Sequence, residues 1–493
     1  MGFKPTIIVD ALVVHNGVVV YTGSLAKAQA VARSLAEASG CRVQQLEFRG
    51  TIVPGFIDAH MHVFGTGLDE HAIDLRECYS IDELKGKLRR ESGRYSKWVY
   101  GRGWDQEKLG RWPTRDDLDE VVPDKPALLV RVCGHVAVAN SKALEVLGID
   151  SEDGLLFEDD AARAVRMVKE SVDPVKPILA GMWAAARNGI TTVADMGADA
   201  RSLAGYVKAQ SLGLVPVRAR VYLSRDLFDN LVKLGFVPAL GDELIRIVGV
   251  KLFADGSLGA RTAYLREPYS DDSSTRGKKL LTSDGVEAVS RRAAEWGLDV
   301  AVHAIGDAAL EEVLKGFAKA GVRGRVEHAS LAPPDLLDLM ARIGVRVAVQ
   351  PRFLVSDYWI VERLGEERAR WAYPYRSMLS RGVTIGFSSD SPVEPLSPLE
   401  GVQAVVTRGV LGELTRDEAL SVEVALHLYT SGSAAVLGED RLGCLSEGCF
   451  ADMTVLSQDP LEAGIDGLRK IEVLATIVGG EVVYDKSRER QVM

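Results

Sequence analysis

Five residues with metal-binding side chains stand at the ends of short apolar segments of the sequence. His60 and His62 form an H-x-H pair, and because residues two apart on an extended strand point to the same side, both imidazoles can reach one ion. His303 and His328 close two further apolar segments. Asp390 ends another, where a carboxylate can complete a ligand set and take a proton from bound water. These residue types indicate metal-assisted hydrolysis.

A sixth candidate, Lys251, lies inside the apolar segment VGVKLFADG. Burial disfavours the charged form of a lysine and lowers its pKa, and a neutral amine reacts with carbon dioxide to give a carbamate. A carbamate is an anionic oxygen ligand that can bridge two metal ions. The alternative is a lysine that reaches solvent or pairs with Asp255, and the local sequence alone favours this alternative.

Each of these residues also has a structural explanation when it is taken alone. A single buried histidine is more often a hydrogen-bonded core residue than a ligand, and an H-x-H pair occurs at solvated strand ends. Asp390, followed by Ser391 and Pro392, suits an N-cap or an Asx-turn. Five classical ligands at the ends of four strands of one barrel are hard to explain by chance, so their coincidence favours a metal site.

The elements that position these residues read as a (β/α)8 TIM-like barrel, an α/β fold. Strand-like segments alternate with longer helical patterns, as in parallel β/α units. Eight strands are expected near residues 57, 193, 220, 252, 302, 327, 348 and 387. In such a barrel the active-site residues lie at the carboxyl ends of the strands.

Two regions lie outside this alternation. The chain ends, 1–54 and 440–493, carry short β-branched segments separated by turn residues, including one at 43–48, and we expect them to pair into a small β-sandwich domain. The barrel is expected over 55–439. Residues 65–180 interrupt it after the first strand and predict an inserted cap with its own strands, one of them in ALLVRVCGHVAVAN, and a helix over 141–147.

Composition limits the class of protein. The 493 residues include 47% hydrophobic and 26% charged residues, which is typical of a globular protein with a large core. A net charge of −10 argues against a nucleic-acid-binding surface, and no apolar segment is long enough to span a membrane. The start of the chain lacks the features of a signal peptide, so the cytoplasm is expected. The five scattered cysteines are expected to be reduced.

Several segments together resemble a known family. PGFIDAHMH, VKLFADGSLGARTA, VAVHAIGDAA, VEHAS and GFSSDSPVEPLSPL are similar to motifs of the amidohydrolase superfamily, in particular the amidohydrolase 3 (YtcJ-like) group of metal-dependent hydrolases. The resemblance extends to GRGWDQ and GHVAVANSKAL in the insertion and to GCFADMTVLSQDP near the end of the chain. It therefore covers nearly the whole sequence.

The resemblance implies a metal centre with one or two divalent ions, expected to be zinc. Its ligands would be His60 and His62 with Asp390 at the more buried ion, a carboxylated Lys251 as the bridge, and His303 with His328 at the second ion. Asp390 would also accept the proton of the attacking water and pass it to the leaving nitrogen. No G-x-S-x-G segment or dinucleotide fingerprint supports another mechanism.

Four residues in family-like segments are candidates for binding the substrate: Trp104, His135, Asn140 and Arg261. Arg261 could hold a carboxylate or carbonyl at the barrel mouth, or pair structurally with Glu267. Trp104 and His135 could close over a ligand, and packing in the core of the cap is an equal alternative for Trp104.

The expected function is hydrolysis of a carbon–nitrogen bond other than a peptide bond, such as an N-acyl or N-formyl amide of a small molecule. Ester, lactone or deaminase chemistry of the same superfamily is the second reading. A barrel without catalytic activity is the third, and the complete ligand set disfavours it. Barrels of this type often pair, so a homodimer is the expected assembly.

Overall fold

The computed structural model describes residues 8–131, 134, 136–235 and 241–489. Contacts divide the chain into two compact units, one formed by residues 1–63 with 182–493 and the other by residues 64–181. The first unit holds the barrel and both chain ends, and the second is the insertion. Among the described residues, no helix is long and apolar enough to cross a membrane.

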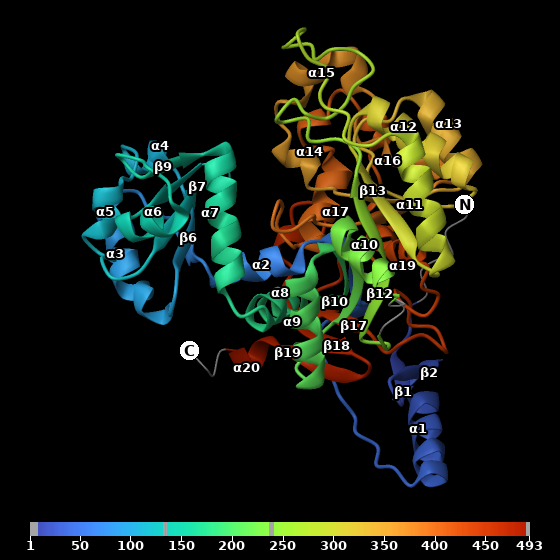
Figure 1. The fold of residues 1–493 in the computed structure, drawn as a ribbon. Helices are drawn as coiled ribbons and strands as arrows, with labels where there is room; N and C mark the ends of the chain where they lie inside the picture. Colours follow the sequence, from blue (N-terminus) through green and yellow to red (C-terminus); the bar gives the residue numbers. More distant parts are fainter. Residues whose placement is uncertain (1–7, 132–133, 135, 236–240, 490–493) are drawn as a thin grey trace. The chain divides into compact units, whose positions relative to one another are not determined.

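Eight parallel strands form the central sheet of the first unit, and the predicted TIM-like barrel is confirmed (Figure 1). In spatial order they are β4 (Phe56–Met61), β10 (Ile190–Ala198), β11 (Arg218–Ser224), β12 (Ile245–Phe253), β13 (Asp299–Ala304), β14 (Arg325–His328), β15 (Arg346–Val349) and β16 (Thr384–Phe387). The backbone N–H of Asp390 donates to the carbonyl of His60 over 2.8 Å, and the N–H of His62 donates to the carbonyl of Ser391 over 2.8 Å. These two bonds join the chain after the last strand to the first strand.

Helices on the outside of the sheet pack against the strands or against neighbouring helices. Those that follow the strands include α9 (Ala200–Ser211), α10 (Arg225–Lys233), α11 (Ser283–Glu295), α12 (Asp307–Ala320), α13 (Pro334–Ile343), α16 (Tyr375–Ser380), α17 (Pro398–Thr407), α18 (Val422–Leu428) and α19 (Ser431–Leu437). In α12, Leu310, Val313, Leu314 and Phe317 are all buried, at the spacing of a single helix face. Each such side chain contributes about 1.5–3 kcal/mol through burial. The helix ends at Gly321, whose positive φ suits glycine.

The two chain ends form two small antiparallel sheets in the first unit. One sheet has the order β19 (Glu481–Asp485), β18 (Val473–Val478), β17 (Met453–Leu456) and β3 (Thr51–Pro54), so a strand from each end of the chain pairs with the other. The second is the hairpin β1 (Ala11–His15) and β2 (Val18–Gly23), followed by α1 (Leu25–Ser39). The expected strand over 43–48 is wrong, because this segment has no regular structure and all of it except the partly buried Phe48 is exposed.

The insertion is an α/β unit with a five-stranded sheet of its own. The order is β5 (Ile73–Asp74), β6 (Val99–Trp104), β7 (Ala127–Arg131), β8 (Val136–Ala139) and β9 (Leu155–Phe157), parallel from β5 to β7 and antiparallel from β7 to β9. The segment 127–140, expected as one strand, is therefore two. The main helices are α3 (Ile81–Glu91), α6 (Ser141–Leu147) and α7 (Glu158–Ser171), and α6 ends at Gly148 as predicted.

The expectation that all cysteines are reduced is wrong for one pair. Cys444 and Cys449 form a disulfide across five positions of the sequence, in a loop where Gly448 takes a φ of 91° that favours glycine. Spacing alone did not reveal this pair, because the tight reversal depends on local backbone geometry. Cys41 and Cys78 are free, and Cys133 lies outside the described residues.

A buried ion pair connects the barrel to the sheet formed by the chain ends. Arg218 on β11 donates to both carboxylate oxygens of Asp452, over 2.7 and 3.0 Å, and Asp452 also accepts the backbone N–H of Gly479 over 2.8 Å. Both side chains are at most 4% exposed. A buried charge that loses its partner is strongly destabilising.

We therefore expect Asp452→Asn to lower the free energy of unfolding by about 3–5 kcal/mol, because Arg218 keeps its charge and loses the partner that compensates it. Asp466→Asn, at an exposed position, is the matched control and should change stability by less than about 0.5 kcal/mol. Denaturant unfolding monitored by circular dichroism measures both. Equal midpoints for the two variants would show that the pair contributes nothing to stability.

Candidate metal centre

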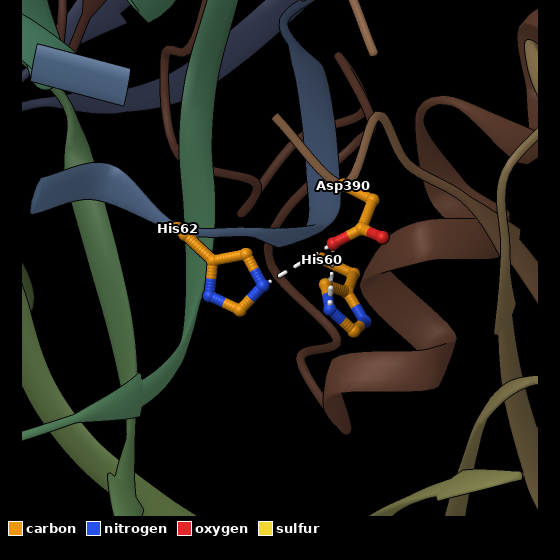
Figure 2. A group of neighbouring side chains, drawn as sticks. All are labelled: His60, His62 and Asp390. Carbon is orange, nitrogen blue, oxygen red and sulfur yellow. Dashed lines mark ion pairs between the residues drawn. The ribbon is translucent and has the colours of Figure 1, made fainter. Parts of the chain in front are cut away.

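His60, His62 and Asp390 come together at the carboxyl end of the barrel strands. Nε2 of His60 and Nε2 of His62 each lie 3.2 Å from the same carboxylate oxygen, Oδ1 of Asp390. Figure 2 shows the two rings directed at this oxygen from the end of β4. One potential ligand atom from each residue lies within 4.8 Å of the others, so the three could hold a metal ion.

Hydrogen bonds on the far side of each ring determine which nitrogen faces Asp390. Nδ1 of His60 lies 2.5 Å from Oε2 of Glu327, and Nδ1 of His62 lies 2.9 Å from the carbonyl oxygen of Met196. Both partners only accept hydrogen bonds, so each Nδ1 carries the proton. In a neutral ring the Nε2 lone pair then faces an anionic oxygen. Two lone pairs and a carboxylate that converge on one point form an arrangement that a cation satisfies.

His303 and His328 form a second pair beside the first. Their ring centroids lie 4.4 Å apart, and the ring of His328 lies 4.9 Å from that of His60. Nδ1 of His328 donates to the side-chain oxygen of Gln350 over 2.7 Å, and Nε2 of His303 donates to the carbonyl of Gly256 over 2.9 Å. Each ring therefore keeps one nitrogen without a proton.

Burial keeps these two imidazoles neutral. It lowers the pKa of His303 to about 3 and the pKa of His328 well below its usual value, and the neighbouring charge of Lys251 acts in the same direction on His303. A neutral imidazole is the form that binds a metal ion. The second pair is thus also suited to a metal by its protonation state.

Lys251 lies within the same group of residues. Its Nζ is 3.5 Å from Nε2 of His60, and burial lowers the pKa of its amine to about 8. Asp255 was the suggested ion-pair partner of Lys251. Its carboxylate instead accepts hydrogen bonds from the backbone N–H groups of Tyr264, Ile305 and Gly306. The amine therefore faces the histidines, with a pKa low enough for a neutral fraction at neutral pH.

The backbone is strained at two of these positions. His328 has a φ of 73° and Asp390 a φ of 61°, both in the left-handed region that side chains other than glycine rarely adopt. Alternation along β14 would send Glu327 and His328 to opposite faces, yet both contact the ring of His60. Strain of this kind persists only where the surroundings impose it, and it collects at functional sites.

Two carboxylates that the sequence analysis missed hold this arrangement in place. Glu327 is fully buried, and Nε of Arg325 lies 2.5 Å from its Oε1. Burial alone would raise the pKa of Glu327, but the charge of Arg325 and the bond to His60 hold it well below the usual range. The signal was visible in RVEH, where two charged residues, Arg325 and Glu327, share one face of a strand.

The second missed carboxylate, Asp58, connects β4 to the segment that carries Asp390. The backbone N–H of Ser389 donates to Oδ1 of Asp58 over 3.0 Å, and its hydroxyl donates to Oδ2 over 2.5 Å. Burial raises the pKa of Asp58 to about 6. Asp58 lies two residues before His60 on the same strand face, and this spacing could have identified it.

Two of the residues predicted to bind substrate, Trp104 and Asn140, make structural contacts within the insertion. Trp104 is buried in the core of the insertion, and its indole N–H donates to the carbonyl of Leu129. Asn140 is also buried and caps α6, with its amide donating to the carbonyls of Val122 and Lys125. These contacts support structural roles for both residues. His135 lies outside the described residues.

Arg261 forms a salt bridge, as its structural alternative predicted, but with a different partner. Its guanidinium donates to Asp271 over 2.7 and 3.2 Å, and Arg363 binds the same carboxylate. The expected partner was Glu267, which is closer in sequence. Asp271 accepts the guanidinium of Arg261 through both carboxylate oxygens, and Arg363 pairs with one of these oxygens.

Comparisons with known proteins agree with this geometry. Residues 50–484 match the family model described as Amidohydrolase family. The chain belongs to the amidohydrolase family. It is 31% identical to the YtcJ protein of Bacillus subtilis (strain 168), whose name assigns it provisionally to the amidohydrolases, over 97% of this chain and 96% of that protein.

Two further relatives extend the comparison. The N-substituted formamide deformylase of Arthrobacter pascens is 26% identical, over 89% of each protein. The crystal structure of an uncharacterized metal-dependent hydrolase from Pyrococcus horikoshii OT3 superimposes with a TM-score of 0.84 at 38% identity, and covers 93% of this chain and 95% of that one. This chain is accordingly an amidohydrolase-type, metal-dependent hydrolase.

The bond between Glu327 and His60 leads to a prediction about metal affinity. We expect Glu327→Gln to weaken zinc binding by roughly 10–100-fold, because a neutral amide holds the proton on Nδ1 of His60 less firmly than a carboxylate does. Titration of the metal-free protein against a chromogenic zinc chelator measures the dissociation constant. Glu366→Gln, at an exposed position, is the matched control. Equal affinity in the two variants would contradict an orienting role for Glu327.

Proposed function

We propose that this protein hydrolyses a carbon–nitrogen bond other than a peptide bond, in an N-acyl or N-formyl amide of a small molecule. The observation that carries the proposal is the convergence of two Nε2 lone pairs on the Asp390 carboxylate at the carboxyl end of the barrel, where such folds place their active sites. The family supports hydrolysis, and the similarity to an N-substituted formamide deformylase supports the type of bond.

The residues of the centre suit a pair of divalent ions, for which we propose zinc. His60 and His62 with Asp390 would hold the more buried ion, and His303 with His328 the second, since each ring directs its unprotonated nitrogen away from its hydrogen-bond partner. Lys251, as a carbamate, would supply a bridging oxygen. When bound, the metal supplies Lewis acidity that favours deprotonation of water and polarises a carbonyl.

Asp390 is the residue we propose as the proton carrier. Burial alone would raise its pKa, but the proximity of His60 and His62 holds the pKa well below the usual range, so the group is ionised and able to accept a proton. It would take the proton from the attacking water and deliver it to the leaving nitrogen. The His62 side chain is 35% exposed, so solvent reaches this edge of the site.

Two other readings make different predictions. An ester or lactone hydrolase of this superfamily would act on esters and leave matched amides intact, and a deaminase would release ammonia instead of formate or acetate. A barrel without activity would turn over neither class, and the full set of ligands disfavours it. We retain a small-molecule substrate, a cytoplasmic location and a homodimer as parts of the proposal.

Replacement of Asp390 tests the proposed proton transfer. We expect Asp390→Asn to reduce turnover of an N-formyl amide by at least about 10²–10⁴-fold, because the amide cannot accept a proton. The readout is the formate that the zinc-loaded protein releases from the substrate. Asp466→Asn is the matched control. Turnover close to that of the unchanged protein would refute the role of Asp390, and turnover of esters alone would favour the second reading.

Lys251 provides a separate test of the bridging carbamate. We expect the intact protein, kept in bicarbonate, to carry the mass of one added carbon dioxide that disappears in Lys251→Ala. This variant should also lose zinc and regain part of it with added propionate, whose carboxylate can replace the carbamate oxygens. Lys278→Ala, at an exposed position of the barrel unit, is the control. An unchanged mass and full zinc content in Lys251→Ala would exclude the carbamate.

A further inference from the structure

Phe253 lies at the mouth of the barrel beside the proposed metal centre. It ends β12 two residues after Lys251, so alternation places both side chains on the same, inward face of the strand. Its ring centroid is 5.1 Å from Nζ of Lys251 and 5.5 Å from the ring of His303, its register partner on β13. The residue is nevertheless 50% exposed. Phe253 is a large apolar side chain at the mouth of the barrel, and half of it is not covered by the protein. It therefore has apolar surface that a ligand can contact.

A second phenylalanine stands on the other side of the histidine pair. The ring of Phe353, at the start of α14 (Phe353–Ser356) just after β15, stacks on His328 with an interplanar angle of 28° and a centroid distance of 6.2 Å. His303 and His328 are themselves 4.4 Å apart. The two phenylalanines thus flank the pair of imidazoles proposed to hold the second ion, and Phe353 is only partly buried.

We infer that Phe253 and Phe353 are specificity-determining residues, and that the substrate carries an aromatic ring next to the bond that is cleaved. This inference rests on the proposed function, because it concerns the group beside the scissile amide. Flat rings stack and pack edge-to-face on phenylalanine at centroid distances of about 4.5–7 Å, which adds to the gain from covering apolar surface. A substrate with a polar group at this position would not cover the exposed face of Phe253, so it would gain no binding free energy from burial of that apolar surface.

The test uses two metal-chelating probes that differ only in this group, benzohydroxamate and acetohydroxamate, and measures their binding to the zinc-loaded full chain by calorimetry. We expect benzohydroxamate to bind at least about tenfold more tightly. Phe253→Ala and Phe353→Ala should each remove most of this difference and leave acetohydroxamate binding unchanged. Leu234→Ala, which removes an exposed apolar side chain of the barrel unit, is the control and should change neither.

The possible outcomes separate this inference from the proposed function. Equal affinity for the two probes, or a preference that survives both alanine variants, overturns the role of the phenylalanines while the metal centre stands. Failure of both probes to bind zinc-loaded protein overturns the metal centre and the inference with it. Phe253→Leu keeps an apolar side chain without a ring, so a lost preference in this folded variant supports an effect of the ring itself.

Discussion

The carboxylate of Glu327 and the ring of His60 form the contact on which the rest of the site depends. A fully buried carboxylate is costly unless its charge is compensated, and Arg325 and His60 provide that compensation from the same interior space. The bond fixes the proton on Nδ1 and turns the other nitrogen toward Asp390. The orientation of the His60 ring therefore follows from the buried charge pair of Glu327 and Arg325. The proposed metal site depends on this orientation.

The architecture of the barrel explains why residues so far apart in sequence meet. Parallel strands bring their carboxyl ends to one edge, and the backbone bonds between the last and first strands place Asp390 against His60. The Asp58–Ser389 contact reinforces the same junction. The positive φ values at His328 and Asp390 are the local cost of this convergence, because extended geometry would direct the side chains elsewhere. The packing of the helices around the barrel stabilises the fold and offsets the free-energy cost of this strain.

The barrel and most of the candidate metal ligands could be predicted from the sequence, because strand periodicity and ligand types at strand ends are both local signals. Strand periodicity located all eight barrel strands, and ligand types at strand ends identified five of the residues that the structure gathers. The resemblance to the family added the sixth, Lys251. Partners across the barrel could not be predicted in the same way. Same-face spacing marks Glu327 and Asp58 in the sequence, but their contacts with His60 and Ser389 follow only from the fold. Asp271 replaces Glu267 as the partner of Arg261, and only tertiary structure brings a second arginine to it. Trp104 and Asn140 are buried within the insertion, where Trp104 packs in the core as its structural alternative predicted.

The most direct test of the central claim is an anomalous difference map from a crystal of the protein with zinc, collected at the zinc absorption edge. The account predicts one anomalous peak among His60, His62 and Asp390 and a second beside His303 and His328. In the electron-density map of the same crystal, it predicts continuous density extending from Lys251 between them. No peak at either position, in crystals whose protein has been reconstituted with zinc, would contradict the assignment of these residues as a metal centre.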